Sequence, residues 1–388
     1  MAEMRAVLDV TGLQAMFDAL RARGYDVFGP TLRDGVIVHD LIRSVDELPR
    51  GITDEQAPGH YRTVPAGTGA FFGYAAAAQS WKRQLFPPRT LLWRRRPGEE
   101  PAEPDAAVPR QALIGVRACE LAALARHDEV LTRRRFTDAD YAARRAAAFI
   151  VAVSCAHPGG TCFCASTGTG PRPADGSGYD LLLTELGAGS PRTHRFLVQP
   201  GTDAGQALLA ELAGRTTVAE TTEADLAEAT AVNRRAETRM GRKLDVEGLH
   251  ELLDREVEHP EWDDVADRCL SCGACTAVCP TCFCTTVDDV TELAGDLADA
   301  TAERWRVWDS CFTADFSYLH GGSVRSSARS RYRQWAMHKF GSWQDQFGAL
   351  GCVGCGRCIT WFPGGIDITE ELAALRQRRR VHPAGGRR

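Results

Sequence analysis

The segment from Cys269 to Pro280 carries four cysteines at a spacing that strongly constrains how this part of the chain folds. Its sequence, CLSCGACTAVCP, matches the ferredoxin run CxxCxxCxxxCP. In that run three thiolates converge on one iron–sulfur cubane, and the fourth ligates the other cluster of a pair. Gly273 lets the backbone wrap tightly at the turn, and Pro280 sets the exit from the loop. This segment therefore predicts an iron–sulfur site.

A second cysteine run lies further along the chain and departs from the pattern at its last position. It contains Cys352, Cys355 and Cys358, but Phe362 stands where the fourth cysteine belongs. In the crossed ligation of two-cluster ferredoxins, Cys279 of the first run completes the cluster of this second run. Two such runs predict a ferredoxin-like domain with two [4Fe-4S] clusters.

The phenylalanine at position 362 leaves the first cluster, held by Cys269, Cys272 and Cys275, one ligand short. Either a neighbouring cysteine supplies the missing thiolate, or the site holds a three-iron cluster, uses a non-cysteine ligand or is lost. The sequence does not choose among these. The spare cysteines in this region are Cys282, Cys284 and Cys311.

Zinc is the alternative metal, because CxxC pairs also build four-cysteine zinc sites. A zinc ribbon needs two such pairs and no more, whereas each run here has a third cysteine at the next three-residue step. Disulfides are disfavoured because such small loops bridge poorly and a chain without an export signal stays in a reducing compartment. A structural zinc-binding protein is therefore only the remote alternative.

A third group of cysteines lies upstream, in a stretch that reads as an α/β unit. The apolar runs ALIGV and FIVAVSC predict neighbouring strands with a helix between them. A cysteine closes each strand, at the edge where α/β proteins usually bind ligands. The tetrapeptide TCFC occurs at both 161–164 and 281–284, which argues against chance burial of single cysteines as small core residues. We expect a third cluster, with the ligands Cys119, Cys155, Cys162 and Cys164.

Turn residues and periodicity divide the chain into regions. The expected fold class is α+β and α/β, multi-domain: an N-terminal α/β region, then a helical connector, then a two-cluster ferredoxin-like domain. The predicted boundaries are 1–95 for a turn-rich N-terminal region, 110–202 for the α/β domain, 203–264 for the connector, 265–375 for the ferredoxin-like domain and 376–388 for a basic tail.

Composition excludes several classes of protein. The net charge of -5 gives no global field for nucleic acid, and no apolar stretch is long enough for a signal peptide or a membrane span. We therefore expect a cytoplasmic protein without nucleic-acid or membrane partners. GxGxxG and GxxxxGK[ST] motifs are both missing, so no flavin or nicotinamide is expected on this chain. Clusters without a substrate-handling cofactor predict an electron relay with no catalytic residues of its own.

Several segments, in order along the chain, resemble the beta subunit of cytosolic NAD(P)-linked nickel–iron hydrogenases, the sulfhydrogenase beta family. The anaerobic sulfite reductase A subunit forms a related family. The likeness spans nearly the whole chain, and Phe362 breaks the family's second CxxCxxCxxxCP run. The segments that carry it are SWKRQLFPPRTLLW (80–93), GVRACELAAL (115–124), SCAHPGGTCFCASTGTGP (154–171), CLSCGACTAVCPTCFC (269–284), WDSCF (308–312) and GCVGCGRCITWFPGGIDITEEL (351–372).

This resemblance implies a member of an oxidoreductase complex that carries only iron–sulfur clusters. In the family, such a chain passes electrons between a flavoprotein that reduces NAD(P) and the hydrogenase small subunit. Together with the cysteine runs, the resemblance implies two to three [4Fe-4S] clusters. The alternative is the A subunit of an anaerobic sulfite reductase, and the identity of the partner chains distinguishes the two.

Overall fold

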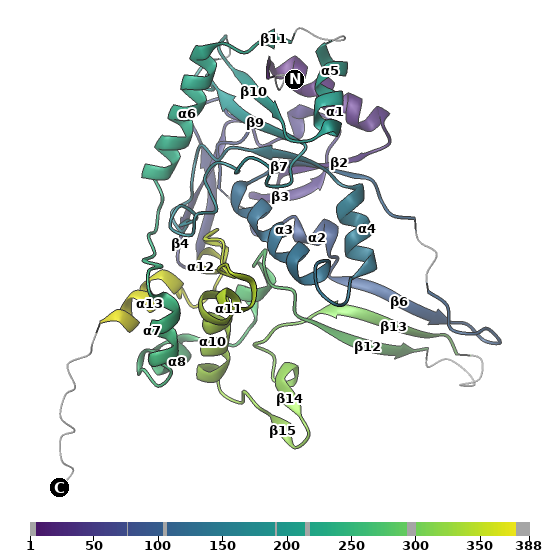
Figure 1. Ribbon diagram of the computed structural model, residues 1–388, viewed down its shortest axis with the longest axis vertical. Coiled ribbons are helices and arrows are strands. Elements are labelled where there is room, and N and C mark those ends of the chain that lie inside the picture. Colours follow the sequence, from purple (N-terminus) through teal and green to yellow (C-terminus); the bar gives the residue numbers. More distant parts are fainter. Residues whose placement is uncertain are drawn as a thin grey trace.

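A mixed eight-stranded sheet is the largest element of the computed structural model, which describes residues 5–75, 77–103, 107–190, 192–213, 218–292 and 300–377. Its strand order is β11-β1-β10-β9-β8-β7-β2-β3 (Figure 1). Strands β2, β7, β8 and β9 run parallel, and the outer strands pair antiparallel. The strands span Ala6–Leu8 (β1), Asp26–Arg33 (β2), Val36–Leu41 (β3), Gln111–Val116 (β7), Phe149–Val153 (β8), Leu181–Leu186 (β9), Arg195–Pro200 (β10) and Ala219–Glu220 (β11).

Helices cover both faces of this sheet, so its central strands are buried throughout. Successive side chains of a strand point to opposite faces, which explains the unbroken apolar runs. Val151 packs with α1 and α5, whereas Ile150 and Ala152 pack with α2, α3 and α4. The covering helices span Val10–Ala22 (α1), Lys82–Leu85 (α2), Ala118–Leu131 (α3), Ala139–Ala147 (α4) and Asp203–Ala213 (α5).

The sheet runs across the boundary that the sequence places between residues 95 and 110. Strands β1, β2 and β3 belong to the 1–95 region, yet they lie in the same sheet as β7 to β10. The last strand of that region, β6 (Arg89–Arg95), pairs instead with β13 (Ala302–Trp308), which also pairs with β12 (Thr285–Thr291). The N-terminal region is therefore not a separate unit, because long-range strand pairing joins it to two other parts of the chain.

The region predicted as a connector, 203–264, is mainly helical and divides between two cores. Helices α5 and α6 (Glu223–Thr238) pack on the sheet, whereas α7 (Leu249–Arg255) and α8 (Glu261–Arg268) pack in the C-terminal core. The predicted basic tail, 376–388, lies outside the described residues from position 378 onward.

A second apolar core gathers the C-terminal helices below the sheet in Figure 1. Its large side chains include Trp262, Phe312, Trp335 and Phe340, all buried, and aromatic side chains bury a large apolar area each. Cys275 belongs to the same core, so the predicted ligand loops are part of its packing. The elements not yet bounded are α9 (Ala274–Ala277), α10 (Ala328–Met337), α11 (Trp343–Phe347), α12 (Arg357–Thr360), α13 (Ile368–Arg376) and the hairpins β4 (Ile52–Ala57) with β5 (His60–Pro65) and β14 (Tyr318–Leu319) with β15 (Gly322–Ser323).

Short hydrogen bonds join the sheet domain to the C-terminal core. The Phe163 N–H donates to the Gly354 carbonyl at 2.8 Å, and the Thr169 hydroxyl donates to the Val353 carbonyl at 2.8 Å. Arg357 of α12 donates to the Glu120 carboxylate of α3 at 2.6 Å, and both side chains are at most 2% exposed. Because removing one partner of such a buried pair is costly, this seam holds the two cores in one arrangement.

We expect Gly354→Ala to destabilise this seam. Gly354 has a φ of +60°, and a Cβ atom there would lie 2.7 Å from the Cα atom of Cys164. The left-handed backbone costs about 1–2 kcal/mol, and overpacking adds about 1–3 kcal/mol. Gly348→Ala is the matched control, because Gly348 has a φ of +67° and nothing within 4 Å of its added Cβ. Thermal unfolding compares them, and equal losses at the two positions would contradict the close contact.

Candidate iron–sulfur sites

The predicted ligand cysteines fall into three groups, numbered site 1 to site 3. No disulfide joins any of the cysteines, all of which lie in the described part of the chain. Site 1 comprises Cys269, Cys272 and Cys275; site 2 comprises Cys279, Cys352, Cys355 and Cys358; site 3 comprises Cys119, Cys155, Cys162 and Cys164.

Site 2 surrounds an enclosed cavity in the C-terminal core. Its four cysteines line this cavity together with the apolar side chains of Phe163, Phe340 and Ile368. Burial raises the pKa of Cys352 to about 12, although the backbone N–H of Gly354 points at its sulfur from 3.4 Å. Thiols buried so deeply become good ligands only when a metal replaces their protons. The cavity and its thiols therefore fit an iron–sulfur cluster.

Two lysines are buried beside site 2, and the sequence pattern did not indicate either. The Lys339 ammonium donates to the Cys279 sulfur at 3.2 Å and to the Thr281 hydroxyl at 3.0 Å. Lys82 of α2 donates to the carbonyls of Cys279 and Cys282 at 3.2 and 3.0 Å. Within the described residues neither lysine forms a carboxylate ion pair, although both are at most 5% exposed. A buried ammonium needs a negative partner, and cluster thiolates would supply it.

The two lysines respond oppositely to their surroundings. Burial acts to lower the pKa of Lys339, but the neighbouring sulfurs of Cys279 and Cys282 outweigh it and raise that pKa well above its ordinary value. For Lys82, burial prevails and the pKa is lowered. Lys339 is therefore the firmly charged cation at site 2.

Site 3 lies at the carboxyl edge of two central strands, as the sequence predicts. Strands β7 and β8 are parallel neighbours, so their C-terminal ends meet at one edge of the sheet. Cys119 follows β7 in the first turn of α3, Cys155 follows β8, and the Cys162 and Cys164 loop faces them. Burial raises the pKa of all four thiols. The buried setting of these thiols favours metal ligation over free thiolates.

Two arginines compensate charge around site 3 and its seam with site 2. The Arg117 guanidinium donates to the Phe72 and Tyr74 carbonyls at 2.9 and 3.0 Å, and its charge opposes the burial that raises the pKa of Cys155. Arg357 pairs with Glu120, and the negative sulfurs of Cys355 and Cys119 also favour its charge. Both guanidiniums are at most 3% exposed, so their charge acts in a medium of low dielectric constant.

Site 1 is the group nearest to solvent. Cys275 is buried, Cys269 is half-buried and Cys272 is exposed, beside Leu270 at 64% exposed. Left-handed backbone at Ser271 and Gly273, with φ of 51° and 73°, makes the loop turn tightly on both sides of Cys272. Phe362 is 3% exposed in the same core, so the position of the absent cysteine is filled by an aromatic ring. Site 1 is thus close to the surface and has three of its four expected ligands.

The spare cysteines lie close to these groups. Cys282 is in side-chain contact with Cys279 of site 2, and Cys284 is in side-chain contact with Cys311. Cys311 also packs against the core that contains Cys275. The structure therefore gathers all three candidates for the missing ligand within the C-terminal region.

The three sites form a row with site 2 in the middle. Site 3 meets site 2 through Cys355, which packs with Cys119 and Cys164, and through the Cys162 sulfur, which lies 3.7 Å from the Cys355 carbonyl oxygen. Site 2 meets site 1 through α9, which separates Cys275 from Cys279 by a single helical turn. Site 2 therefore adjoins both of the other sites.

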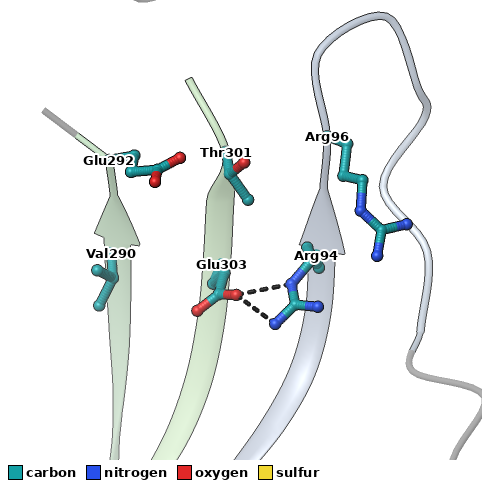
Figure 2. A pocket seen from close by; sticks show the side chains of 6 residues that line it. All are labelled: Arg94, Arg96, Val290, Glu292, Thr301 and Glu303. Atoms are coloured by element: carbon teal, nitrogen blue, oxygen red, sulfur yellow. Dashed lines mark hydrogen bonds and ion pairs between the residues drawn. The ribbon is translucent and has the colours of Figure 1, made fainter. Parts of the chain in front are cut away.

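The pocket in Figure 2 lies on the β6–β13–β12 sheet and holds no thiol. Arg94 and Glu303 pair there across neighbouring strands at 2.6 Å. Nowhere in the described ranges do three His, Cys, Asp or Glu side chains meet so as to hold a single metal ion. No described helix is long and apolar enough to cross a membrane. Cubane ligands each bind a different iron, so their sulfurs need not meet at one point. The pocket residues are Arg94, Arg96, Val290, Glu292, Thr301 and Glu303.

Fold and sites together define an iron–sulfur protein in which a two-cluster ferredoxin-like domain is joined to an α/β domain. A family model described as a 4Fe-4S dicluster domain matches residues 268–366, which include both cysteine runs. The chain is also 31% identical to sulfhydrogenase 2 subunit beta of Pyrococcus furiosus over 304 residues, which cover 76% of this chain and 85% of that protein. The chain belongs to the sulfhydrogenase beta subunit family. The predicted family, fold class and iron–sulfur character are confirmed.

Proposed function

We propose that this chain relays electrons through three [4Fe-4S] clusters, between a nickel–iron hydrogenase module and a flavoprotein that reduces NAD(P). The observation that carries the proposal is the row of three cysteine sites, with site 2 in contact with both others. Iron–sulfur clusters supply one-electron steps at potentials from about −700 to +450 mV. The name of the Pyrococcus furiosus relative supports membership of a multi-subunit sulfhydrogenase. In this proposal the flavin belongs to a partner, and the complex works in the cytoplasm.

The chain's own residues hold the ligands, exclude water and balance charge. Phe163, Trp335 and Phe340 wall site 2 with apolar surface, which keeps the effective dielectric constant low. Lys339 at site 2 and Arg117 at site 3 would stabilise the additional negative charge that each site gains on reduction. Electrons would therefore pass along the row without a substrate ever binding to this chain.

Site 1 is the place where an external partner has the shortest approach. The Cys272 side chain is exposed, whereas at site 3 three of the four thiols are buried. A redox partner that docks over the 269–273 loop would bring its own centre close to site 1. We therefore assign site 1 to one end of the relay, in contact with a partner chain of the complex.

Anaerobic isolation of the tagged chain with its partners from its own host tests this proposal. We expect the complex to contain nickel and flavin. EPR should show that H2 reduces the clusters of this chain and that NAD(P)+ then reoxidises them. A complex with sirohaem in place of nickel would instead identify a sulfite reductase. Clusters that H2 cannot reduce would contradict the hydrogenase assignment.

A further inference from the structure

We propose that Cys311 is the fourth ligand of site 1 and replaces the ferredoxin cysteine that is absent at position 362. This assignment rests on the proposed function, because it presupposes that site 1 holds a cluster. It follows from how the three spare cysteines are placed relative to sites 1 and 2.

Cys282 belongs to the surroundings of site 2. Its side chain contacts Cys279, which is a site 2 ligand in the crossed scheme. Its carbonyl oxygen accepts a hydrogen bond from Lys82, which also bonds the Cys279 carbonyl. These contacts hold Cys282 on the side of site 2 and away from the 269–273 loop.

Cys311 is bound to the site 1 loop by its neighbours. The adjacent Ser310 hydroxyl hydrogen-bonds the Thr276 hydroxyl at 2.7 Å, and Thr276 in turn donates to the Gly273 carbonyl at 2.8 Å. A Cβ atom on Gly273 would lie 3.3 Å from the Ser310 Cβ atom, so the Ser310 side chain packs closely against the Gly273 turn. Position 311 is therefore held against the turn that carries Cys272 and Cys275.

Packing also favours Cys311 over Cys284 as the fourth ligand. Cys311 packs against the apolar core that includes Cys275 and Phe362, together with half-buried Cys269. Cys284 is not among the described residues of that core. The Cys284 sulfur contacts the Cys311 sulfur, and the Cys311 sulfur also lies close enough to Cys275 of site 1 to interact with it. Cys284 is thus a neighbour of the ligand, able to share a hydrogen bond with its sulfur.

Phe362 accounts for the exchange of ligands. Its ring is buried, and a Cβ atom on Gly364 would lie 2.8 Å from the ring's Cε1 atom, so the ring is closely enclosed. A thiol at position 362 would leave much of this space empty, whereas the ring completes the core beside the cluster. The fourth ligand is then supplied by the loop that follows β13.

Iron, acid-labile sulfide and EPR of three anaerobically prepared alanine variants test the assignment. We expect about twelve irons in the wild type, Cys282→Ala and Cys284→Ala, and about eight or nine in Cys311→Ala, with loss of one EPR-active cluster. Cys282→Ala and Cys284→Ala are matched controls, since each also removes one thiol from the same region. Cys311→Ala combined with Phe362→Cys is expected to regain iron, because position 362 completes site 1 in the ferredoxin scheme.

An unchanged iron content in Cys311→Ala would overturn the assignment, as would an equal loss in Cys284→Ala. Loss of all clusters from Cys311→Ala without recovery in the double variant would also overturn it. These results differ from failure of the proposed function, which would show as a wild type that lacks iron and sulfide or as a wild-type complex whose clusters H2 cannot reduce.

Discussion

A complex with Cys358→Ala is expected to lose H2-dependent NAD(P) reduction while it keeps H2-dependent methyl viologen reduction. Cys358 is half-buried and lines the site 2 cavity, and site 2 stands between the other two sites. In the proposed complex, viologen would accept electrons at the hydrogenase module, whereas NAD(P)+ would receive them only through the clusters of this chain. Mutation of a residue that hydrogen-bonds a metal ligand already lowers metal affinity or activity roughly 10–100-fold. Loss of a ligand itself should therefore cost at least that much.

Three measurements make this result specific. Iron content should fall from about twelve to about eight per chain, since one cubane is lost. NAD(P)H-dependent viologen reduction, which tests the flavoprotein alone, should be unchanged. Retention of full H2-dependent NAD(P) reduction after loss of the site 2 signal would show that electrons bypass site 2, and the proposed row would be wrong.

Lys339→Met is expected to lower the reduction potential of the site 2 cluster by on the order of 100 mV. The Lys339 ammonium donates directly to the Cys279 sulfur at 3.2 Å, and it is buried. A positive charge stabilises the reduced, more negative state of a cluster, so its removal favours the oxidised state. Two unit charges 4 Å apart in a medium of effective dielectric constant 20 interact by about 4 kcal/mol, which sets the scale of this effect.

Two lysines provide the comparison for this potential shift. Lys82→Met should shift the potential less, because Lys82 bonds backbone carbonyls and its pKa is lowered by burial. Lys243→Met should leave it unchanged, because Lys243 is exposed and solvent screens its charge. EPR-monitored redox titration measures all three. Equal potential shifts in Lys339→Met and Lys243→Met would show that Lys339 does not tune the potential of the site 2 cluster.

The cysteine runs could be recognised from sequence because their ligands are local. The spacing from Cys269 to Cys279 reflects the shape of a single loop. The structure places these thiols on that loop, with a left-handed turn at Gly273. The positions of Cys119 and Cys155 after the ends of two parallel neighbouring strands could also be predicted, since each depends on its own strand. Short-range patterns were sufficient wherever a ligand's position depends on its own strand or loop.

The charges that face these ligands could not be predicted, because they come from distant segments. Lys82 lies 197 positions from Cys279, and Arg357 lies 237 positions from Glu120. Nothing in the local sequence of a lysine or arginine marks it as buried, and most such residues are exposed. The pairing of β6 with β13 was missed for the same reason, since strand partners far apart leave no local signal.

The most direct test of the three-cluster relay is the iron and acid-labile sulfide content of the anaerobically purified chain, together with EPR of the dithionite-reduced protein. Three complete cubanes predict about twelve irons and about twelve sulfides per chain, with magnetic interaction among neighbouring clusters. About eight irons would mean that one of the three sites is empty and the row is broken. Zinc without sulfide would contradict the electron-transfer account altogether.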